Sequence, residues 1–345
     1  MADMRTFADL EATRDALGRS RLFTCWARAL ALGSLTGDDP RMVFRSTVPT
    51  HLRAAVPGTT FDPAESVPSF ARAFLDGVAR ATALGRLGSM TLPCPPHVRT
   101  PIVTTTGAAR FVAAGAPAPL LRLDVDLAVL RPAHVVSLVA VSKELLATDD
   151  PRAMGVLERQ LRRVVVAAED AALLDDVGVL GERPAGLLFG LSPVGGGSPD
   201  AIADDVRALI DSVRDGEPNT LAFVTSRRGA AYLRALANTA DGSLFRDVSI
   251  GIDSELAGAP LLLSSAAGAR LIALDPSLLG VADDGLDVGV SASASISQDD
   301  APASPANMVS AFQTGSAIIR LIRRIDWVLG AADAAAYITL PLGSP

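Results

Sequence analysis

The stretch FVAAGAPAPLLRLDVDLAVLRP, Phe111 to Pro132, constrains the fold of this chain more than any other. From Leu121 to Val129 apolar residues alternate with Arg122, Asp124, Asp126 and Ala128, and Leu130 breaks the alternation. A period of two predicts a strand with one buried face. The preceding TPIVTTTGAARFVA is also strand-like, so residues 100–132 are expected to form a long β-hairpin with GAPAP at its tip. An isolated hairpin is marginally stable in water, so this one must lie against another surface.

Composition narrows the function classes. The chain has 345 residues, of which 49% are hydrophobic, enough for one large or two ordinary domains. No apolar run approaches the roughly 18 residues of a membrane helix, and the acidic N-terminus is unlike a signal peptide, so no membrane partner is expected. A net charge of -7 lacks the basic footprint of a protein that reads nucleic-acid sequence. The two cysteines, Cys25 and Cys94, fit a reducing compartment without disulfides.

The order of expected elements is mixed α+β without regular βαβ alternation. Helices are expected over residues 6–32, 68–84, 200–214 and 227–238, and the Pro-, Gly- and Thr-rich residues 37–68 read as an extended arm. Strands are expected at 134–142 (buried), 220–226, 259–265, 269–275, 286–296, 312–328 and 336–340.

The most regular helix is expected over residues 150–176. Asp150 is placed as N-cap and Pro151 at the first helical position. Glu158 and Arg162 can pair at i, i+4. One apolar stripe comprises Leu157, Leu161, Val164, Val165, Ala168 and Ala172. At roughly 38 Å, such a helix suits a structural spine.

No group of residues makes a convincing active site, and we expect no catalytic residue, cofactor or metal. The Gly-rich turn at residues 194–200 could bind phosphate, but it lacks a P-loop Lys and places acidic residues in the next helix, so a flexible loop is favoured. Cys94 and His97 lack partners for a zinc site. The lone histidines, His51 and His134, are expected to be structural, with His134 packed or paired.

Two sets of charged residues are candidate contact residues. Asp124 and Asp126 lie about 7 Å apart on one face of the expected strand, and a partner-facing or solvated edge is favoured over acid–base chemistry. Arg320, Arg323 and Arg324 could contact phosphate, but arginine also suits ion pairs at protein interfaces, which is the favoured interpretation.

Taken in order, six segments resemble a tailed-bacteriophage major capsid protein of the Hong Kong 97 type. They are ARFVAAGAPAP, VVSLVAVSKELLATDD, AAEDAALLDDVGVLGERPAGLL, NTLAFVTSRRGAAYLRAL, GAPLLLSSAAGARLIALDPSLL and FQTGSAIIRLIRRIDWVLGAADAAAYIT. The resemblance covers about residues 70–339, and its strength lies in the order of the segments.

The resemblance implies an N-terminal arm (1–66), a peripheral domain (67–186) with the spine helix and the hairpin as an extended loop, an axial domain (187–307) and a return to the peripheral domain (308–345). It implies a subunit that assembles into hexamers and pentamers of an icosahedral shell around double-stranded DNA. The hairpin would lie on a neighbouring subunit, which would provide the surface that an isolated hairpin needs. Contact residues are then expected at Gly115, Pro117, Pro119, Arg122, Asp124, Asp126, Arg320, Arg323 and Arg324.

The partners implied are copies of this chain, separate scaffolding and portal proteins, a possible cement protein, and packaged DNA held without sequence preference. The place implied is the virion capsid, assembled in the bacterial host cytoplasm. Some members of the family crosslink a lysine of the extended loop, but Lys143 is the only lysine here and residues 100–132 contain none, so no such network is expected. Because only about 66 residues precede the matched region, no maturation cleavage is expected.

Two other functions remain open. An encapsulin-like compartment shell has the same fold but encloses enzyme cargo, and packaged DNA or a cargo enzyme would distinguish the two. An α/β enzyme that binds a phosphate ligand at residues 194–200 is the third possibility, and a stable ligand-binding monomer would support it.

Overall fold

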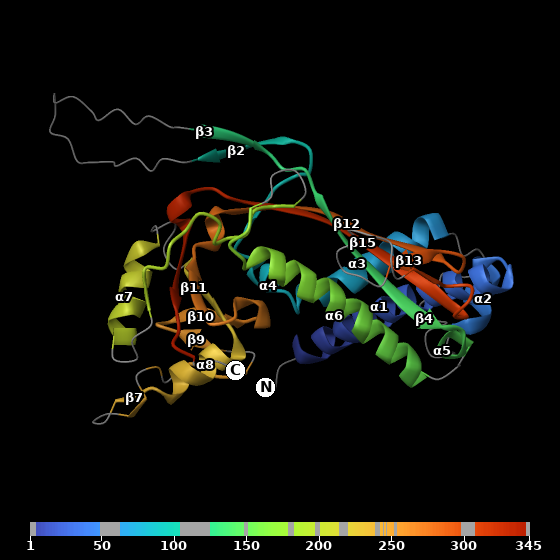
Figure 1. The fold of residues 1–345 in the computed structure, drawn as a ribbon, viewed down its shortest axis with the longest axis horizontal. Coiled ribbons are helices and arrows are strands. Elements are labelled where there is room, and N and C mark those ends of the chain that lie inside the picture. Colours follow the sequence, from blue (N-terminus) through green and yellow to red (C-terminus); the bar gives the residue numbers. More distant parts are fainter. Residues whose placement is uncertain are drawn as a thin grey trace. The chain divides into compact units, whose positions relative to one another are not determined.

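The chain divides into two compact units (Figure 1). Unit 1 comprises residues 1–81, 134–168 and 285–324, and unit 2 comprises residues 82–133, 169–284 and 325–345. A computed structural model describes residues 5–48, 63–103, 125–147, 151–178, 183–196, 201–213, 220–238, 242–243, 245, 247–251, 254–297 and 308–342. Four elements have residues in both units: α6 (Pro151–Leu173), β4 (Ala133–Ser142), β12 (Leu279–Ser291) and β15 (Ser316–Leu329).

Unit 1 is built on helices. They are α1 (Arg5–Thr36), α2 (Pro40–Thr47), α3 (Pro63–Ala79), α5 (Lys143–Ala147) and most of α6 (Pro151–Leu173). Helix α2 corrects the expected extended arm over residues 37–68. Asp39 caps this helix, because its Oδ1 accepts a hydrogen bond of 2.9 Å from the backbone N of Arg41, and Pro40 occupies the first turn.

The described N-terminal helices pack into the core of unit 1. Phe23 and Phe74 are fully buried with ring centroids 4.8 Å apart, which joins α1 to α3. Trp26 packs edge-on against Phe44 at 5.6 Å, which joins α1 to α2. Leu161 of α6 belongs to the same cluster. The described N-terminal helices therefore supply much of the hydrophobic core of this unit.

In unit 1, parts of β12 (Leu279–Ser291), β15 (Ser316–Leu329) and β4 (Ala133–Ser142) form a sheet against these helices, in this order, so that β4 is an edge strand. The short β1 (Leu92–Pro93) pairs with the part of β12 that belongs to unit 2. Val141 on β4 and Ile319 on β15 belong to the helical core cluster. One face of the sheet is therefore covered by helices. The short pair β13 (Ser295–Ser297) and β14 (Met308–Ser310) precedes β15.

Unit 2 is built on a six-stranded sheet. Its order is β5 (Gly195–Gly196), β16 (Ala335–Thr339), β11 (Arg270–Leu274), β6 (Ala222–Thr225), β10 (Ala259–Leu263) and β9 (Glu255–Leu256). Its central strands are buried on both faces: Phe223 and Ala273 are paired on one face, Val224 and Ile272 on the other, and all four are fully buried.

Helices α7 (Ile202–Ser212) and α8 (Arg227–Ala235) share a hydrophobic cluster with this sheet. Ser226 caps α8, because its Oγ accepts a hydrogen bond of 3.1 Å from the backbone N of Gly229. Unit 2 also contains α4 (Ala83–Leu87), the hairpin β2 (Arg99–Val103) and β3 (Val125–Val129), and the pair β7 (Ala237–Asn238) and β8 (Gly242–Ser243).

The expected α+β class and most of the expected elements are confirmed. The spine helix is α6, and its Glu158–Arg162 ion pair is present at 2.7 Å. Two details are wrong. The strand over residues 134–142 alternates between covered and exposed positions instead of being buried throughout, and His134 is exposed instead of packed.

Candidate inter-subunit surfaces

The described part of the expected hairpin is the antiparallel pair β2 and β3. Its register runs from Arg99 opposite Val129 to Val103 opposite Val125, with Asp126 opposite Ile102. The expected strands are thereby confirmed next to the base. The tip lies outside the described residues, and with it the candidate contact residues Gly115, Pro117, Pro119, Arg122 and Asp124.

Two hydrogen bonds donated by backbone N atoms hold the base of the hairpin, one between its two arms and one to the side chain of Asp326 on β15. The backbone N of His97 donates to the carbonyl of Leu130 at 2.9 Å, and the backbone N of Arg131 donates to Oδ2 of Asp326 at 2.7 Å. The side chain of Leu130 is 5% exposed and packs with Cys94. The residues that follow β3 therefore have a defined place, although the strands themselves form only a two-stranded sheet.

The apolar alternation predicted for this segment ends differently from what was expected. Val129, assigned to the buried face, is 40% exposed, and Leu130, which breaks the pattern, is the buried residue. The strand ends at Val129, so the period of two no longer decides where the next side chain points. Val129 therefore remains available for contact beyond this chain.

Asp326 is an unusual anchor because it is a partly buried carboxylate. It accepts hydrogen bonds from the backbone N of Arg131 and, through Oδ1, from the backbone N of Trp327 at 2.9 Å. Burial raises the pKa of Asp326 above its ordinary value, and the two hydrogen bonds oppose this shift without cancelling it. The carboxylate is held at an energetic cost where it fixes the hairpin base.

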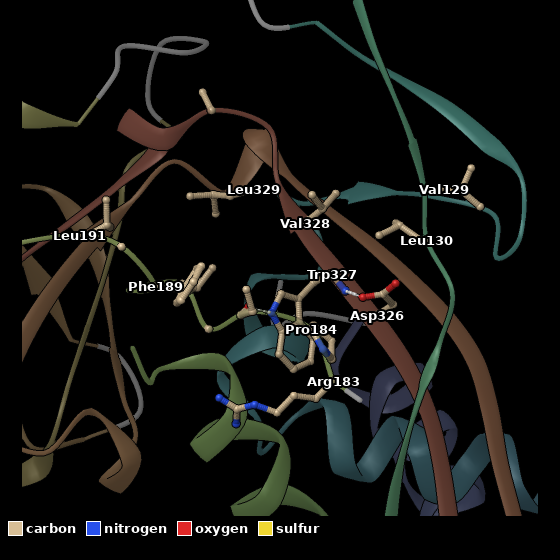
Figure 2. A pocket seen from close by; sticks show the side chains of 15 residues that line it. Val129, Leu130, Arg183, Pro184, Phe189, Leu191, Asp326, Trp327, Val328 and Leu329 are labelled. Carbon is tan, nitrogen blue, oxygen red and sulfur yellow. Dashed lines mark hydrogen bonds between the residues drawn. The ribbon is translucent and has the colours of Figure 1, made fainter. Parts of the chain in front are cut away.

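An open cavity of about 570 Å³ lies beside this anchor (Figure 2). Its lining is mainly apolar and includes Phe189, Trp327 and Leu329, with Asp326 and Arg183 also on the wall. Nε1 of Trp327 donates to the carbonyl of Ala185 at 2.8 Å, which fixes the loop that carries Phe189. Phe189 is nevertheless 54% exposed. The cavity is an apolar recess beside the hairpin base.

Strand β4 has a second face that is exposed, whereas Ile318 on the same face of the neighbouring strand β15 is only 4% exposed. On β4, Val136 and Leu138 are 52% and 53% exposed, whereas Val141 on the other face is buried. Exposed apolar residues grouped on one face of a sheet are typical of a surface that contacts another protein. This face of β4 is the clearest candidate for such a contact in unit 1.

The three candidate arginines of β15 do not act together. Arg320 is exposed on the outward face, but Arg323 is 6% exposed and its Nη1 donates to the carbonyl of Gly285 at 3.3 Å. Because residues an odd number apart point to opposite faces of a strand, Arg323 points to the opposite face from Arg320 and Arg324. In the folded chain Arg323 is an internal residue, and of the three only Arg320 is exposed.

Sequence reasoning missed the exposed apolar residues. Val136 and Leu138 were read as part of a buried strand, and Phe312, between β14 and β15, is 81% exposed. The signal was present in HVVSLVAVS, where both faces of the strand are apolar. Strands that are apolar on both faces are usually covered on both, but this chain covers only one face of β4.

The residues considered for chemistry are not assembled into a site. Cys94 is buried and free, whereas His97 is exposed. Among the described residues, no group of three or more His, Cys, Asp or Glu side chains could hold a metal ion. The described helices also include none that is long and apolar enough to cross a membrane.

The exposed apolar residues of β4, the hairpin and the apolar cavity are each typical of surfaces that contact other proteins. Residues 67–340 match the model of the phage capsid family. The chain belongs to this family, and its role is structural. The resemblance to tailed-phage major capsid proteins is thereby confirmed.

Relatives agree with this assignment. The chain is 27% identical over 286 residues to the capsid polyprotein of Pseudomonas phage PAJU2, which covers 77% of this chain but only 43% of the relative. A solved chain of Microbacterium phage Oxtober96 is similar with a TM-score of 0.54 and 17% identity, covering 75% of this chain and 91% of that one. A chain of Gordonia phage Cozz gives a TM-score of 0.53 at 15% identity, with coverage of 75% and 86%.

Proposed function

We propose that this chain is the major capsid subunit of a tailed phage and assembles into hexamers and pentamers of an icosahedral shell that encloses double-stranded DNA. The observation that carries the proposal is the family match over residues 67–340, which includes residues of both units. The exposed Val136, Leu138 and Phe312 support it, because each would lose apolar surface to water on assembly.

Assembly would also complete the hairpin. A two-stranded sheet gains stability when it packs on another surface, so the β2–β3 hairpin would lie on a neighbouring copy. In this proposal Gly115, Pro117, Pro119, Arg122, Asp124, Asp126 and Arg320 contact that neighbour. Asp326 would set the position of the hairpin base within its own subunit.

The other partners follow from the same proposal. A scaffolding protein would guide assembly, a portal would occupy one vertex, and a cement protein would add stability to a shell without crosslinks. Residues 100–132 contain no lysine, so the shell would be held by noncovalent contacts and would dissociate to single chains in boiling detergent. Assembly would take place in the cytoplasm of the bacterial host.

The test is velocity sedimentation and negative-stain imaging of the chain expressed alone and with the scaffolding protein encoded beside it. We expect rings or closed shells, and nuclease-protected duplex DNA inside native particles. A chain that stays a monomer of 35.6 kDa under both conditions would contradict the proposal.

An encapsulin-like compartment shell is the second candidate, because the same exposed surfaces would serve it. Shells that contain an enzyme and no protected DNA would favour the compartment. The phosphate-ligand enzyme has no support in the described residues around the Gly-rich turn. Gly195 lies close to the carboxylate of Asp205, which would repel a phosphate ligand at that backbone.

A further inference from the structure

The acidic side chains of α6 are buried, whereas several of its basic side chains are exposed. Its acidic side chains, Glu158, Glu169 and Asp170, are 8%, 2% and 5% exposed. Arg152, Arg159 and Arg163 are exposed to solvent. The described solvent-facing side of this helix therefore has positive charges and no negative ones.

The three arginines form one line along the helix. At 3.6 residues per turn, positions separated by seven and eleven residues fall within an arc of about 40°. At 1.5 Å per residue the line is about 16 Å long. The exposed residues beside it, Val156 and Gln160, are uncharged. We call Arg152, Arg159 and Arg163 the α6 arginine line.

The buried Glu158 of unit 1 does not offset the charges of Arg159 and Arg163. Glu158 accepts a hydrogen bond of 2.7 Å from Nη2 of Arg162 and one of 2.8 Å from Oγ of Ser20, and Arg21 lies 4.0 Å from it. The charge of Glu158 is therefore paired within the chain. No acidic residue stands three or four positions from Arg159 or Arg163, where a helical ion pair would form.

The stability of the helix does not explain the line. Arg152 lies in the first turn, where the helix dipole favours negative charge, and Glu169 and Asp170 lie near the last turn, where it favours positive charge. Arg159 and Arg163 are like charges at i, i+4, which also destabilises a helix. Each arrangement costs a few tenths of a kcal/mol or more, so the reason for the line lies outside the helix.

The net charge of unit 1 is compatible with an anionic partner. It contains 18 Arg and Lys against 16 Asp and Glu, whereas unit 2 contains 13 against 22. The net negative charge of the chain therefore resides in unit 2. The net charge of unit 1 therefore repels a polyanion less than the net charge of unit 2 does.

We propose that the α6 arginine line binds the phosphate backbone of double-stranded DNA without sequence preference; this inference rests on the proposed function as a DNA-enclosing shell. Arginine guanidinium groups match phosphate geometry and remain charged at every relevant pH. A duplex offers one negative charge per about 1.7 Å of axis, so a line of this length meets phosphates in any register. Uncharged neighbours leave nothing to select a base sequence.

A second copy of this chain is a less suitable partner. The described acids with matching spacing are Asp204 and Asp211 on α7, seven residues apart. Asp204 already receives Nη1 of Arg207 at 2.8 Å. A duplex presents many equivalent charges that are free of such internal pairing.

The test compares two triple variants of the full chain. R152Q/R159Q/R163Q removes the line, and R41Q/R45Q/R72Q removes three exposed arginines from α2 and α3 of the same unit. Glutamine preserves helix propensity. The probe is a fluorescein-labelled duplex of about 30 base pairs and random sequence, titrated with unassembled chain at several salt concentrations. Shell formation is scored separately by sedimentation.

Removal of the line is expected to weaken duplex binding and to lower the slope of log K against log salt by about 2.7, since each phosphate contact contributes about 0.9. The control triple should retain the slope. Equal binding by the wild type and the line variant, or no binding by the wild type at low salt, would overturn the inference. A line variant that binds DNA normally but forms no shells would instead assign the line to a subunit contact. Failure of the wild type to form shells would count against the proposed function alone, because binding is measured without assembly.

Discussion

The two sheets of this molecule differ in how completely their own chain covers them. In unit 2, Phe223 and Val224 point to opposite faces of β6 and both are fully buried. In unit 1, Val141 is buried on one face of β4, while Val136 and Leu138 on the other face are more than half exposed. The central strands of the unit 2 sheet are buried on both faces, whereas β4 in unit 1 is buried on one face only.

The difference separates stability from assembly. A residue buried on both sides contributes to folding of the single chain. A residue on the open face contributes little until a partner covers it. The stabilities of the two units can be measured separately because each unit has one buried tryptophan, Trp26 in unit 1 and Trp327 in unit 2.

The largest effect is expected at the centre of the unit 2 sheet. Phe223→Ala removes a fully buried aromatic ring and should lower the unfolding free energy of unit 2 by about 3–5 kcal/mol. Urea unfolding followed by Trp327 fluorescence in a W26F background measures this loss. A loss below about 1 kcal/mol would show that the site collapses around the substitution and that the core is less rigid than its burial indicates.

A smaller effect is expected where the two faces of β15 are compared. Arg323→Ala removes an internal hydrogen bond to Gly285 and should cost about 1–3 kcal/mol, whereas Arg320→Ala should change stability by less than about 0.5 kcal/mol. Trp26 fluorescence in a W327F background reports on this unit. Equal losses for the two variants would mean that the strand faces are wrongly assigned.

The anchor of the hairpin predicts a pH dependence. The pKa of Asp326 is raised by burial above its ordinary value of 3.8, so the folded chain holds this proton more tightly than the unfolded chain. Its ionised form therefore destabilises the fold, and stability gained through this group should increase as pH falls through the folded pKa toward 3.8.

The difference in unfolding free energy between the wild type and Asp326→Asn isolates this contribution, because the other titrating groups cancel. Measured from pH 7 downward, the difference should move in favour of the wild type. A difference that stays constant with pH, or moves the other way, would show that the two backbone hydrogen bonds outweigh burial.

The smallest effect on stability, and the largest on assembly, is expected on the open face of β4. The double substitution Val136→Thr and Leu138→Thr places β-branched residues at both positions of an exposed strand, so stability should change by less than about 0.5 kcal/mol. Under the proposed function, the protein concentration needed for shell formation should rise at least about tenfold, which corresponds to about 1.4 kcal/mol per subunit. Sedimentation at a series of concentrations measures this.

Met42→Thr is the matched control, because Met42 is 64% exposed on α2 of the same unit. It should leave shell formation unchanged. If both variants impair assembly equally, the open face of β4 has no special part in the contact.

Local signals predicted the regular elements well. Helix α6 was expected over residues 150–176 and spans Pro151–Leu173, because its apolar stripe and its Glu158–Arg162 pair depend only on neighbours along the chain. Helix α2 was missed although Asp39 and Pro40 are a strong N-terminal signal. The surrounding Gly, Pro and Thr residues outweighed that signal.

The contact surfaces were harder to predict from sequence. The alternation along β15 was sufficient to separate Arg323 from Arg320, although grouping them by proximity along the chain did not use it. The open face of β4 is a different case. An apolar run such as HVVSLVAVS shows that both faces need cover, but it contains no information on which face the same chain covers.

Lys143, the only lysine of the chain, stands exposed at the start of α5. Once the α-amine of the N-terminus is blocked, an amine-reactive reagent has one target per subunit, and the 30 arginines do not compete for it at ordinary pH. A fluorophore, a spin label or a crosslinker could therefore be placed at one chemically defined position on every copy without mutation. In a closed shell, the number of attached labels would count the subunits.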